Sequence, residues 1–333
     1  MKMWIAKNKK YLRPFLFLLT GVLVWWALRQ VSPAELWRTL TAIHPLWIAL
    51  LLAVNGGVIW LFGSRWWVIL RVLKHHPPYR HLVAYRLTAF GISYFTPGTQ
   101  FGGEPAQIYL LSRRDGVPTT DAIFSVTIDK LFELAFNFAF LGVGVLIVLR
   151  AGLFAAEPLP GLSAMAFAVA ALPLLALAVL CSGKQPRVPR LHRLGRVPLL
   201  RKAVSAIKTA QETGAPLCRK SPGQMLLAAM LSAAIWLALV AEYRLMVQAL
   251  GVSLSLTETV VLLTAARLAF LFPAPGGLGA LEAGQVIAME ALGFDPALGL
   301  SLSLLIRARD ILFGLAGLWL GKMLSGKNTA HPK

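Results

Sequence analysis

The sequence predicts an all-α integral membrane protein, with about six full spans and two re-entrant broken-helix hairpins arranged as an inverted repeat. Three observations lead to this fold class. Apolar residues make up 57% of the chain and charged residues only 14%, whereas about a quarter of the residues in soluble domains are charged. Long apolar runs alternate with short basic segments. A Pro-Gly turn that interrupts one apolar stretch at Pro97 occurs again 178 positions later, at Pro275.

Six stretches of the chain are long and apolar enough to be full spans. A helix needs about 20 mainly apolar residues to cross the hydrocarbon core. The first stretch follows a basic segment, but no small-residue cleavage site comes after it, so we expect a retained span and not a signal peptide. The predicted spans are 14–30, 46–70, 120–149, 163–182, 224–248 and 297–321.

The formal net charge of +19 is distributed as in a membrane protein and not as in a nucleic-acid-binding domain. Lys and Arg gather in the segments between the apolar runs instead of forming one basic region. Because basic loops of membrane proteins stay on the cytoplasmic side, the pattern predicts both termini in the cytoplasm and no nucleic-acid partner. Most of the positive charge lies in the N-terminal tail, 71–86, 113–114, 184–220 and the C-terminal tail.

Two further apolar stretches, 82–111 and 256–292, are too interrupted to be ordinary spans. Proline removes a backbone donor and glycine tolerates unusual dihedral angles, so each helix must break at its Pro-Gly turn. The charge pattern requires each stretch to enter and leave on one side, the first from the cytoplasm and the second from outside. Non-helical backbone at this depth must be buried in protein or line a wet cavity, so we predict two re-entrant hairpins. The turn residues are Pro97, Gly98, Gly102, Gly103, Pro275, Gly276, Gly277 and Gly279.

The two hairpins belong to halves of the chain that align without a gap. A shift of 178 positions places Glu104 on Glu282 and Gln107 on Gln285, so both halves contain Pro-Gly-x5-Glu-x-x-Gln. The extra span between the halves turns the second one upside down, and inverted repeats with discontinuous helices are typical of transporters. Chance matching of apolar sequences is the alternative, but Pro, Gly, Glu and Gln in fixed register favour a repeat.

The organisation that follows is a single membrane domain over 1–322 with a cytoplasmic tail at 323–333. Cys181 and Cys218 lie in or beside the most basic loop, which is expected to be cytoplasmic, so no disulfide is predicted. The parts of the domain are the N-terminal tail and first span (1–44), the first repeat (45–149), a connecting span with the basic cytoplasmic loop (150–222) and the inverted second repeat (223–321).

The glutamates of the shared motif are the first candidates for function. Glu104 and Glu282 begin the second half-helix of each hairpin, where a carboxylate interacts favourably with the helix dipole and with free amides. Ionisable groups at membrane depth are costly and usually mark a pathway, so we also expect both to face a central cavity. Together with Gln107 and Gln285, they are predicted to bind substrate.

The span after each hairpin carries further charges. Asp129 and Glu133 share one helix face, and Arg307 and Asp310 share another. The repeat places Asp129 opposite Arg307, so oppositely charged faces are expected to meet near the pseudo-symmetry axis. Arg307 is assigned to substrate binding. The acidic residues and Lys130 are assigned a supporting or proton-coupling role, with structural ion pairing as the alternative.

Arg267 lies in an apolar run and needs either a buried partner or an anionic ligand. Its planar guanidinium suits two oxygens of a phosphate, so we include it in the substrate site. Arg65, Glu242 and Arg244 are expected nearer the membrane interfaces, where long side chains reach water. The sequence contains no nucleotide-binding loop, metal-ligating cluster or nucleophile–base pair, so we predict no cofactor, no metal and no enzymatic activity.

The segments around both breaks resemble a known family. The matching pieces are Thr96-Pro97-Gly98 with Gly103-Glu104, Gly116-Val117-Pro118 with the run from Ser125 to Leu131, Phe272 to Gly279 with Glu282, and Leu305-Ile306-Arg307. They are similar to the flippase-like, UPF0104-type family related to the membrane region of lysylphosphatidylglycerol synthase, the bacterial multiple peptide resistance factor. The resemblance extends over roughly residues 10 to 322.

The resemblance implies lipid translocation in a bacterial inner membrane, or a role beside enzymes that build glycolipids, hopanoids or aminoacylated phospholipids. The aminoacyl-transferase domain of the full synthase is absent from this sequence, so lysyl transfer is not expected. The family often has Glu-Arg where this chain has Asp129-Lys130. That difference preserves the charge signs but not a bidentate arginine contact.

The resulting prediction is a lipid flippase or transporter that moves a phospholipid or glycolipid-type amphiphile between leaflets, with a midplane head-group site at the two hairpins. The expected partners are membrane phospholipids or glycolipids, with lipid-modifying enzymes as further candidates. Two alternatives stay open: a membrane-embedded enzyme or accessory subunit of lipid modification, and a small-solute secondary transporter.

Overall fold

The computed structural model of the chain describes residues 43–96, 102–150, 221–272 and 275–326, together with the single positions 38, 41, 171 and 175. The elements of this part of the chain are helices, as the sequence predicts. They are α3 (Pro45–Val72), α4 (Tyr79–Phe95), α5 (Glu104–Asp115), α6 (Thr119–Arg150), α10 (Pro222–Ala249), α11 (Leu256–Ala269), the 3-10 turn η1 (Pro275–Gly277), α12 (Ala280–Ala291) and α13 (Pro296–Gly326).

Local sequence explains where several of these helices begin. Pro45, Pro105 and Pro222 stand in the first turns of α3, α5 and α10, where a missing backbone amide removes no helical hydrogen bond. α11 begins with a capping box between Ser255 and Glu258. Hydrogen bonds from the side chain and the backbone amide of Ser255 lower the pKa of Glu258, because they stabilise its charged form.

Three of the described helices, α3, α6 and α10, are long and apolar enough to cross a membrane. They expose large hydrophobic side chains such as Leu46, Val143 and Leu237, as expected where helices face lipid and not water. The described architecture is therefore all-α with apolar spans. The predicted spans that fall within these three helices are 46–70, 120–149 and 224–248.

The number of six spans stays a prediction. Stretch 297–321 lies within α13, which has 31 residues, but its apolar character is interrupted by Arg307, Arg309 and Asp310. α13 is not among the helices apolar enough to count as spans by length and composition. Stretches 14–30 and 163–182 fall outside the described residues, apart from positions 171 and 175.

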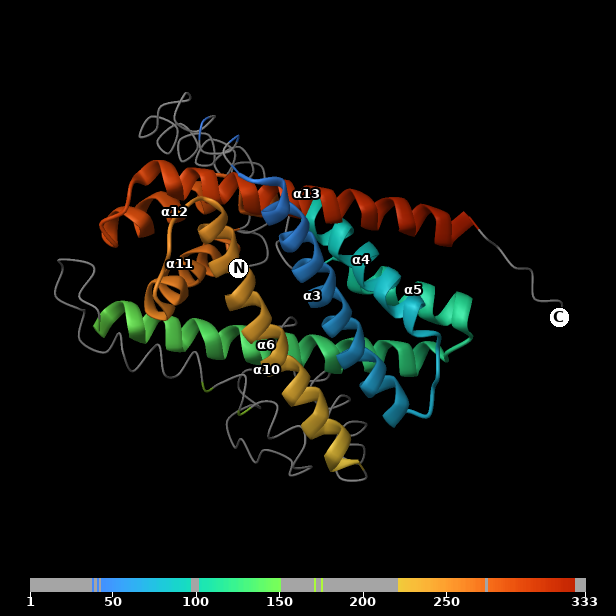
Figure 1. Ribbon diagram of the computed structural model, residues 1–333. Coiled ribbons are helices and arrows are strands. Elements are labelled where there is room, and N and C mark those ends of the chain that lie inside the picture. The colour runs from blue at the N-terminus through green and yellow to red at the C-terminus, as the bar shows by residue number, and fades with distance from the viewer. Residues whose placement is uncertain are drawn as a thin grey trace, which may run out of the picture.

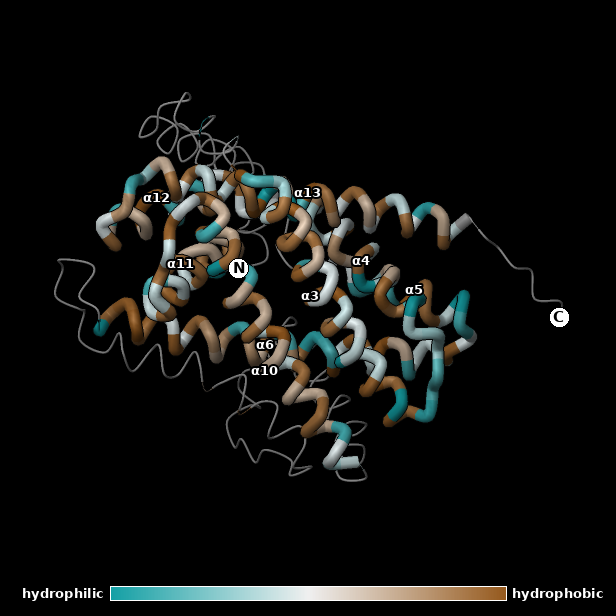
Figure 2. Tube along the Cα trace, in the orientation of Figure 1, coloured by the Kyte–Doolittle hydropathy of each residue, from teal (hydrophilic) through white to brown (hydrophobic). Residues whose placement is uncertain are grey.

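Elements from the two halves of the chain interlock. In Figure 1, α3 and α10 lie next to each other, α4 and α5 occupy one end of the molecule, and α11 and α12 occupy the other. α13 packs against α4 and α12, whereas α6 packs against α11 and α5. Figure 2 shows hydrophobic residues along the length of these helices, with hydrophilic residues at many helix ends and at a few positions inside. Each long helix therefore holds parts of both halves together.

Both predicted helix breaks coincide with helix ends in the structure. α4 and α5 are separated by residues 96–103, and α11 and α12 by residues 270–279. In the first hairpin, the backbone amide of Gly103 donates to the Ser93 hydroxyl at 3.0 Å. Gly103 also lies so close to the backbone of Ala89 that a side chain would not fit. The two half-helices of this hairpin therefore pack directly on each other.

Small residues let α13 approach α4. Gly314, Gly317 and Gly321 lie on the face of α13 that meets α4. A Cβ atom at Gly317 would collide with the carbonyl oxygen of Leu87. In lipid, where the hydrophobic effect does not drive helices together, such close backbone packing is a main source of helix association.

We expect Gly317→Ala to destabilise the protein by about 1–3 kcal/mol, the usual effect of overpacking, because the new Cβ forces α13 away from Leu87. Gly57→Ala is the matched control, since Gly57 lies inside α3 and a Cβ there meets nothing within 4 Å. The better helix propensity of alanine should leave that variant neutral or slightly stabilised. Thermal unfolding of the detergent-solubilised proteins measures both. Equal melting temperatures would contradict the close contact of α4 with α13.

Candidate functional site

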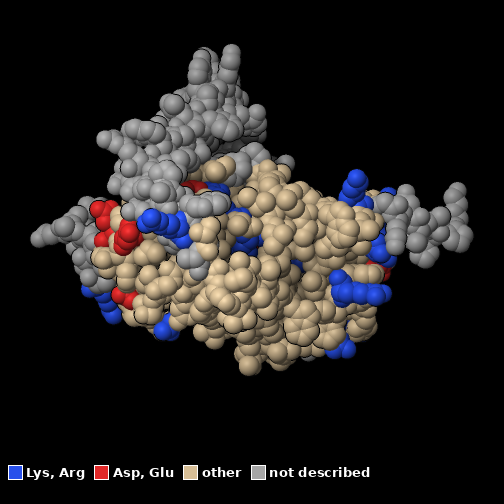
Figure 3. All heavy atoms as spheres, turned by 45° about the horizontal axis from the view of Figure 1, so that its top comes forward, with Lys and Arg blue, Asp and Glu red and all other residues tan. Residues whose placement is uncertain are grey.

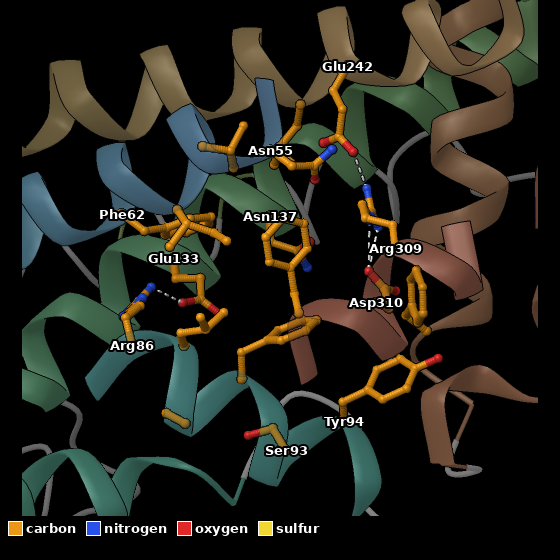
Figure 4. Close-up of a pocket in the computed structure, with 18 of the residues that line it drawn as sticks. Asn55, Phe62, Arg86, Ser93, Tyr94, Glu133, Asn137, Glu242, Arg309 and Asp310 are labelled. Atoms are coloured by element: carbon orange, nitrogen blue, oxygen red, sulfur yellow. Dashed lines mark hydrogen bonds and ion pairs between the residues drawn. The ribbon is translucent and has the colours of Figure 1, made fainter. Parts of the chain in front are cut away.

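A cavity of about 300 Å³ lies among the described helices and is lined by both halves of the chain. The first half contributes residues of α3, α4, α5 and α6, and the second contributes residues of α10, α11, η1 and α13. Figure 4 shows charged side chains on two sides of the cavity, with aromatic and amide side chains between them. Its size is at the lower end of the range of about 300–1,000 Å³ that is usual for small-ligand sites.

The first charged cluster joins α3, α4 and α6. Arg65 Nε donates to Asp129 Oδ1 at 2.7 Å, and both side chains are 1% exposed. Arg86 contacts the other oxygen of Asp129 and donates to Glu133 at 2.7 Å. Because an isolated buried charge is very costly, these pairs fix α6 to α3 and α4. Two arginines and two carboxylates thereby neutralise each other on one side of the cavity.

The first Pro-Gly motif faces the cavity. Glu104 and Gln107 both line it. One oxygen of Glu104 accepts a hydrogen bond from the Gly102 amide at 2.8 Å, and the other lies 3.3 Å from Lys130 Nζ. Lys130 also donates to Glu133 at 2.8 Å, which connects the hairpin to the first cluster. Glu104 therefore caps its own half-helix and faces the cavity as well.

The second Pro-Gly motif is satisfied within the protein. Glu282 forms a two-point contact with Arg307, whose Nη2 lies 2.8 Å from Oε2. Gln285 is fully buried, donates to the Leu262 carbonyl at 3.1 Å and accepts a hydrogen bond from the Tyr243 hydroxyl. Neither Glu282 nor Gln285 belongs to the cavity lining. Residues at matching positions of the two motifs therefore have different surroundings.

The ion pair between Glu282 and Arg307 also holds the turn of the second hairpin. Arg307 donates to the Gly276 carbonyl at 3.2 Å, and Glu282 accepts from the Gly279 amide at 2.9 Å. Gly276 has a φ of 56° and Gly277 a φ of 62°, a region that favours glycine. Gly276 lines the cavity. The turn therefore reaches the cavity, although the ion pair that supports it does not.

The pseudo-symmetric positions Asp129 and Arg307 take partners within their own halves of the chain. Asp129 contacts Arg65 and Arg86, and Arg307 contacts Glu282. Sequence symmetry predicts that the charged faces of these two spans meet, but the ion pairs in the described structure join each span to its own half. For these two residues the structure shows ion pairing within the protein.

A second charged cluster lies on the other side of the cavity (Figure 4). Arg309 of α13 contacts Glu242 of α10 and lies 2.8 Å from Asp310. Glu242 and Arg65 do not reach water as the prediction expects, because they are 2% and 1% exposed and both are paired. Hydropathy locates a residue along one helix but does not reveal a partner on another.

Arg267 differs from the other arginines of the cavity. Its guanidinium lies over the Trp236 ring, 4.9 Å from the centroid, and Trp236 stacks on Phe140. The Nε atom of Arg267 is buried and has no hydrogen-bond partner in the described part of the chain. A cation–π contact holds a guanidinium in place without neutralising its charge. Arg267 is therefore a fixed positive charge in the cavity wall.

Most of the residues that line the cavity are not among those that the sequence predicts for the site. Arg86, Asn137, Trp236 and Arg309 all line the cavity. A polar residue inside an apolar span is the available signal, and it marks Asn137 and Arg309 as candidates. Nothing in the pattern distinguishes Arg86 from a residue of a basic loop, or Trp236 from one facing lipid.

Some predicted features are only partly within the described structure. The turn residues Pro97 and Gly98 lie outside it, and of Pro275 the backbone alone is described. Within residues 43–96, 102–150, 221–272 and 275–326, no group of three His, Cys, Asp or Glu side chains is placed to hold a metal ion.

We expect Glu282→Gln to cost about 3–5 kcal/mol, because it leaves Arg307, whose side chain is only 11% exposed, without its counter-ion. Glu104→Gln should cost no more than about 1 kcal/mol, since the Glu104 side chain is 24% exposed and its partner Lys130 remains paired with Glu133. Thermal unfolding of the two variants measures the difference. The double variant Glu282→Gln with Arg307→Met should recover part of the loss. Equal losses in the two single variants would contradict the different surroundings of the two motifs.

Comparison with known proteins agrees with a membrane protein of this kind. The family described as Lysylphosphatidylglycerol synthase TM region matches residues 15–317. A UPF0104 membrane protein of Methanothermobacter thermautotrophicus is 24% identical over 280 residues, which cover 80% of this chain and 82% of that protein. A second protein of the same name and organism is 31% identical over 99 residues, covering 30% of this chain and 28% of that protein. Because the family match includes nearly the whole chain, this protein belongs to the multi-pass, membrane-embedded Lysylphosphatidylglycerol synthase TM region family.

Proposed function

We propose that this protein is a lipid flippase or lipid transporter, which moves a phospholipid or glycolipid-type amphiphile between the leaflets of its membrane. The observation that carries the proposal is the cavity of about 300 Å³, which places charged and aromatic side chains between helices apolar enough to span a membrane. Ionisable side chains at this depth are costly and usually mark a substrate pathway. In this proposal the head group occupies the cavity while the tails remain in lipid.

The outer surface of the described helices supports this division between head group and tails. Figure 3 shows a broad face of uncharged residues, with Lys and Arg gathered mainly toward its left and right ends. On α13, the large hydrophobic side chains of Leu312, Leu315 and Trp319 are more than half exposed (52%, 56% and 61%). Acyl chains can lie against such a surface at little cost, because an acyl chain that moves from lipid onto this surface passes from one apolar environment to another.

We also propose that the halves 45–149 and 223–321 form the inverted repeat that the sequence predicts. The helix contacts support it, because α4 packs on α13 as α11 packs on α6, and α5 packs on α6 as α12 packs on α13. The first helices of the halves, α3 and α10, pack on each other. A pseudo-two-fold axis in the membrane plane produces this pattern. The interrupted helix pairs are then re-entrant hairpins from opposite sides, and both termini lie in the cytoplasm.

Within this proposal the predicted site residues divide into two groups. Glu104, Gln107 and Arg267 line the cavity and contact the head group. Arg307 and Glu282, with Gln285, hold the second hairpin so that its Gly276 turn reaches the cavity. The partners are membrane phospholipids or glycolipids, and lipid-modifying enzymes that make or use them.

Leaflet exchange of labelled lipids in reconstituted vesicles tests the proposal. We expect the wild-type protein to exchange at least one phospholipid or glycolipid class faster than protein-free vesicles do. Asn137→Phe places a large ring in the cavity and should lower the initial rate by about tenfold, as a barrier higher by about 1.4 kcal/mol would. Val143→Phe is the control on the same helix, because Val143 is 52% exposed and lies outside the cavity lining.

Two results would contradict the proposal. One is a folded wild-type protein that exchanges no lipid of any class. The other is an equal rate for Asn137→Phe and wild type, which would place the pathway outside this cavity. Turnover of a lipid substrate without exchange would favour a membrane-embedded enzyme instead.

A further inference from the structure

Three buried side-chain polar atoms in the described part of the chain lack a hydrogen-bond partner, and two of them belong to arginines of the cavity. These two are Nε of Arg267 and Nη2 of Arg65, while the third, Oγ of Ser112, lies outside the cavity lining. A buried donor without an acceptor is destabilising, and more so when it carries charge. The two unsatisfied guanidinium donors therefore indicate an acceptor that arrives through the cavity.

The two arginines differ in how far their charge is neutralised. Arg65 pairs with Asp129 at 2.7 Å, and its Nη2 lies 3.9 Å from Glu133. In the part of the chain that the structure describes, no carboxylate oxygen lies within 4.0 Å of a guanidinium nitrogen of Arg267, the limit for an ion pair. The aromatic face of Trp236 is the group that holds it. Arg267 thus presents a positive charge that an incoming anion can neutralise.

The carboxylates that line the cavity are already paired with cations. The pairs are Glu104 and Glu133 with Lys130, and Glu242 and Asp310 with Arg309. A head-group amine would have to compete with Lys130 or Arg309 for one of these carboxylates, although each of the two cations would keep its second carboxylate. An anion that binds Arg267 competes with no ion pair of the described structure. The charge arrangement therefore favours an anionic head group over an amine-bearing one.

Two amide side chains add uncharged hydrogen-bonding groups to the same cavity. Gln107 is 4% exposed and Asn137 is 5% exposed, and both line the cavity. Neither carboxamide has a hydrogen-bond partner among the residues that the structure describes. A carboxamide both donates and accepts, so the two side chains suit hydroxyl groups as well as phosphate oxygens.

We propose that the cavity binds a phosphate group at Arg267, and that its substrate class is anionic phospholipids whose head group carries hydroxyls and no amine. This inference rests on the proposed lipid transport and names the substrate of that site. The planar guanidinium of Arg267 binds two phosphate oxygens, and Nη2 of Arg65 offers a further donor. Gln107 and Asn137 bind the head-group hydroxyls. Charge-assisted hydrogen bonds of this type are about twice as strong as neutral ones.

Equilibrium binding to the purified full-length chain in detergent tests the inference. The probes are short-chain phosphatidylglycerol, which is anionic and hydroxylated, and short-chain phosphatidylcholine, whose phosphate is balanced by a quaternary ammonium. We expect the wild-type protein to prefer phosphatidylglycerol by about tenfold, or 1.4 kcal/mol. Arg267→Gln should weaken phosphatidylglycerol binding by about tenfold to a hundredfold and remove the preference.

Arg71→Gln is the matched control. Arg71 also lies over a tryptophan, 4.3 Å from the ring centroid of Trp67, but it is exposed and lies outside the cavity lining. This variant should bind phosphatidylglycerol within about twofold of wild type, well under the 1.4 kcal/mol of a tenfold change. Equal loss of binding in Arg71→Gln and Arg267→Gln would overturn the proposed phosphate site.

The melting temperature of the lipid-free protein distinguishes a binding role for Arg267 from a structural one. Because its charge has no ion-pair partner in the described structure, Arg267→Gln should leave the melting temperature unchanged or raise it. A clear fall would overturn the inference, since it would show that the guanidinium stabilises the fold through Trp236 or through nearby carboxylates.

Further probes separate this inference from the proposed transport. Glycerol 3-phosphate has the phosphate without acyl tails and should bind more weakly than phosphatidylglycerol. Equal affinity would assign the site to a soluble phosphate ester and overturn the proposed lipid class.

Phosphatidylglycerol binding that requires Arg267, without leaflet exchange of any lipid, would contradict the transport proposal alone. Exchange of phosphatidylcholine and phosphatidylglycerol at equal rates, unchanged in Arg267→Gln, would overturn the phosphate site alone.

Discussion

Charges that lie inside the helix bundle need partners from other helices, and this requirement organises the described structure. Arg65 and Asp129, each 1% exposed, join α3 to α6, while Glu282 and Arg307 join α12 to α13. Removing one partner of such a pair leaves an uncompensated charge in a low-dielectric interior, at a cost of about 3–5 kcal/mol. The ion pairs therefore specify which helices meet, and the close glycine contacts of α13 with α4 determine how near they come.

The same requirement gives different roles to two motifs that are alike in sequence. In the second half, position 307 is an arginine, so Glu282 has a cation on the adjacent helix and is sealed with it away from the cavity. In the first half the matching position is Asp129, which offers no attraction to Glu104. Glu104 contacts Lys130 instead and stays in the cavity wall. The charges on the following helix thus differ between the halves, and one motif lines the cavity while the other is paired within the protein.

Arg267 is the cavity charge that the described residues leave without an ion pair, and it connects the structure to function. Its stacking on Trp236 fixes its position while its charge stays available to a ligand. Membership in the Lysylphosphatidylglycerol synthase TM region family places the chain among membrane proteins related to lipid modification. The ligand that we propose, an amphiphile with a polar head group, fits both a charged cavity and an apolar exterior.

The sequence by itself determined the all-α membrane class, three of the apolar spans, both helix breaks and the family, because hydropathy, proline and glycine act locally along the chain. It also selected Glu104, Gln107 and Arg267, which prove to line the cavity. Only the tertiary structure decided which charge pairs with which, since that depends on how separate helices are placed. For this reason hydropathy does not predict that Arg65 is buried in an ion pair, or that Gln285, which matches Gln107 in register, is buried outside the cavity lining.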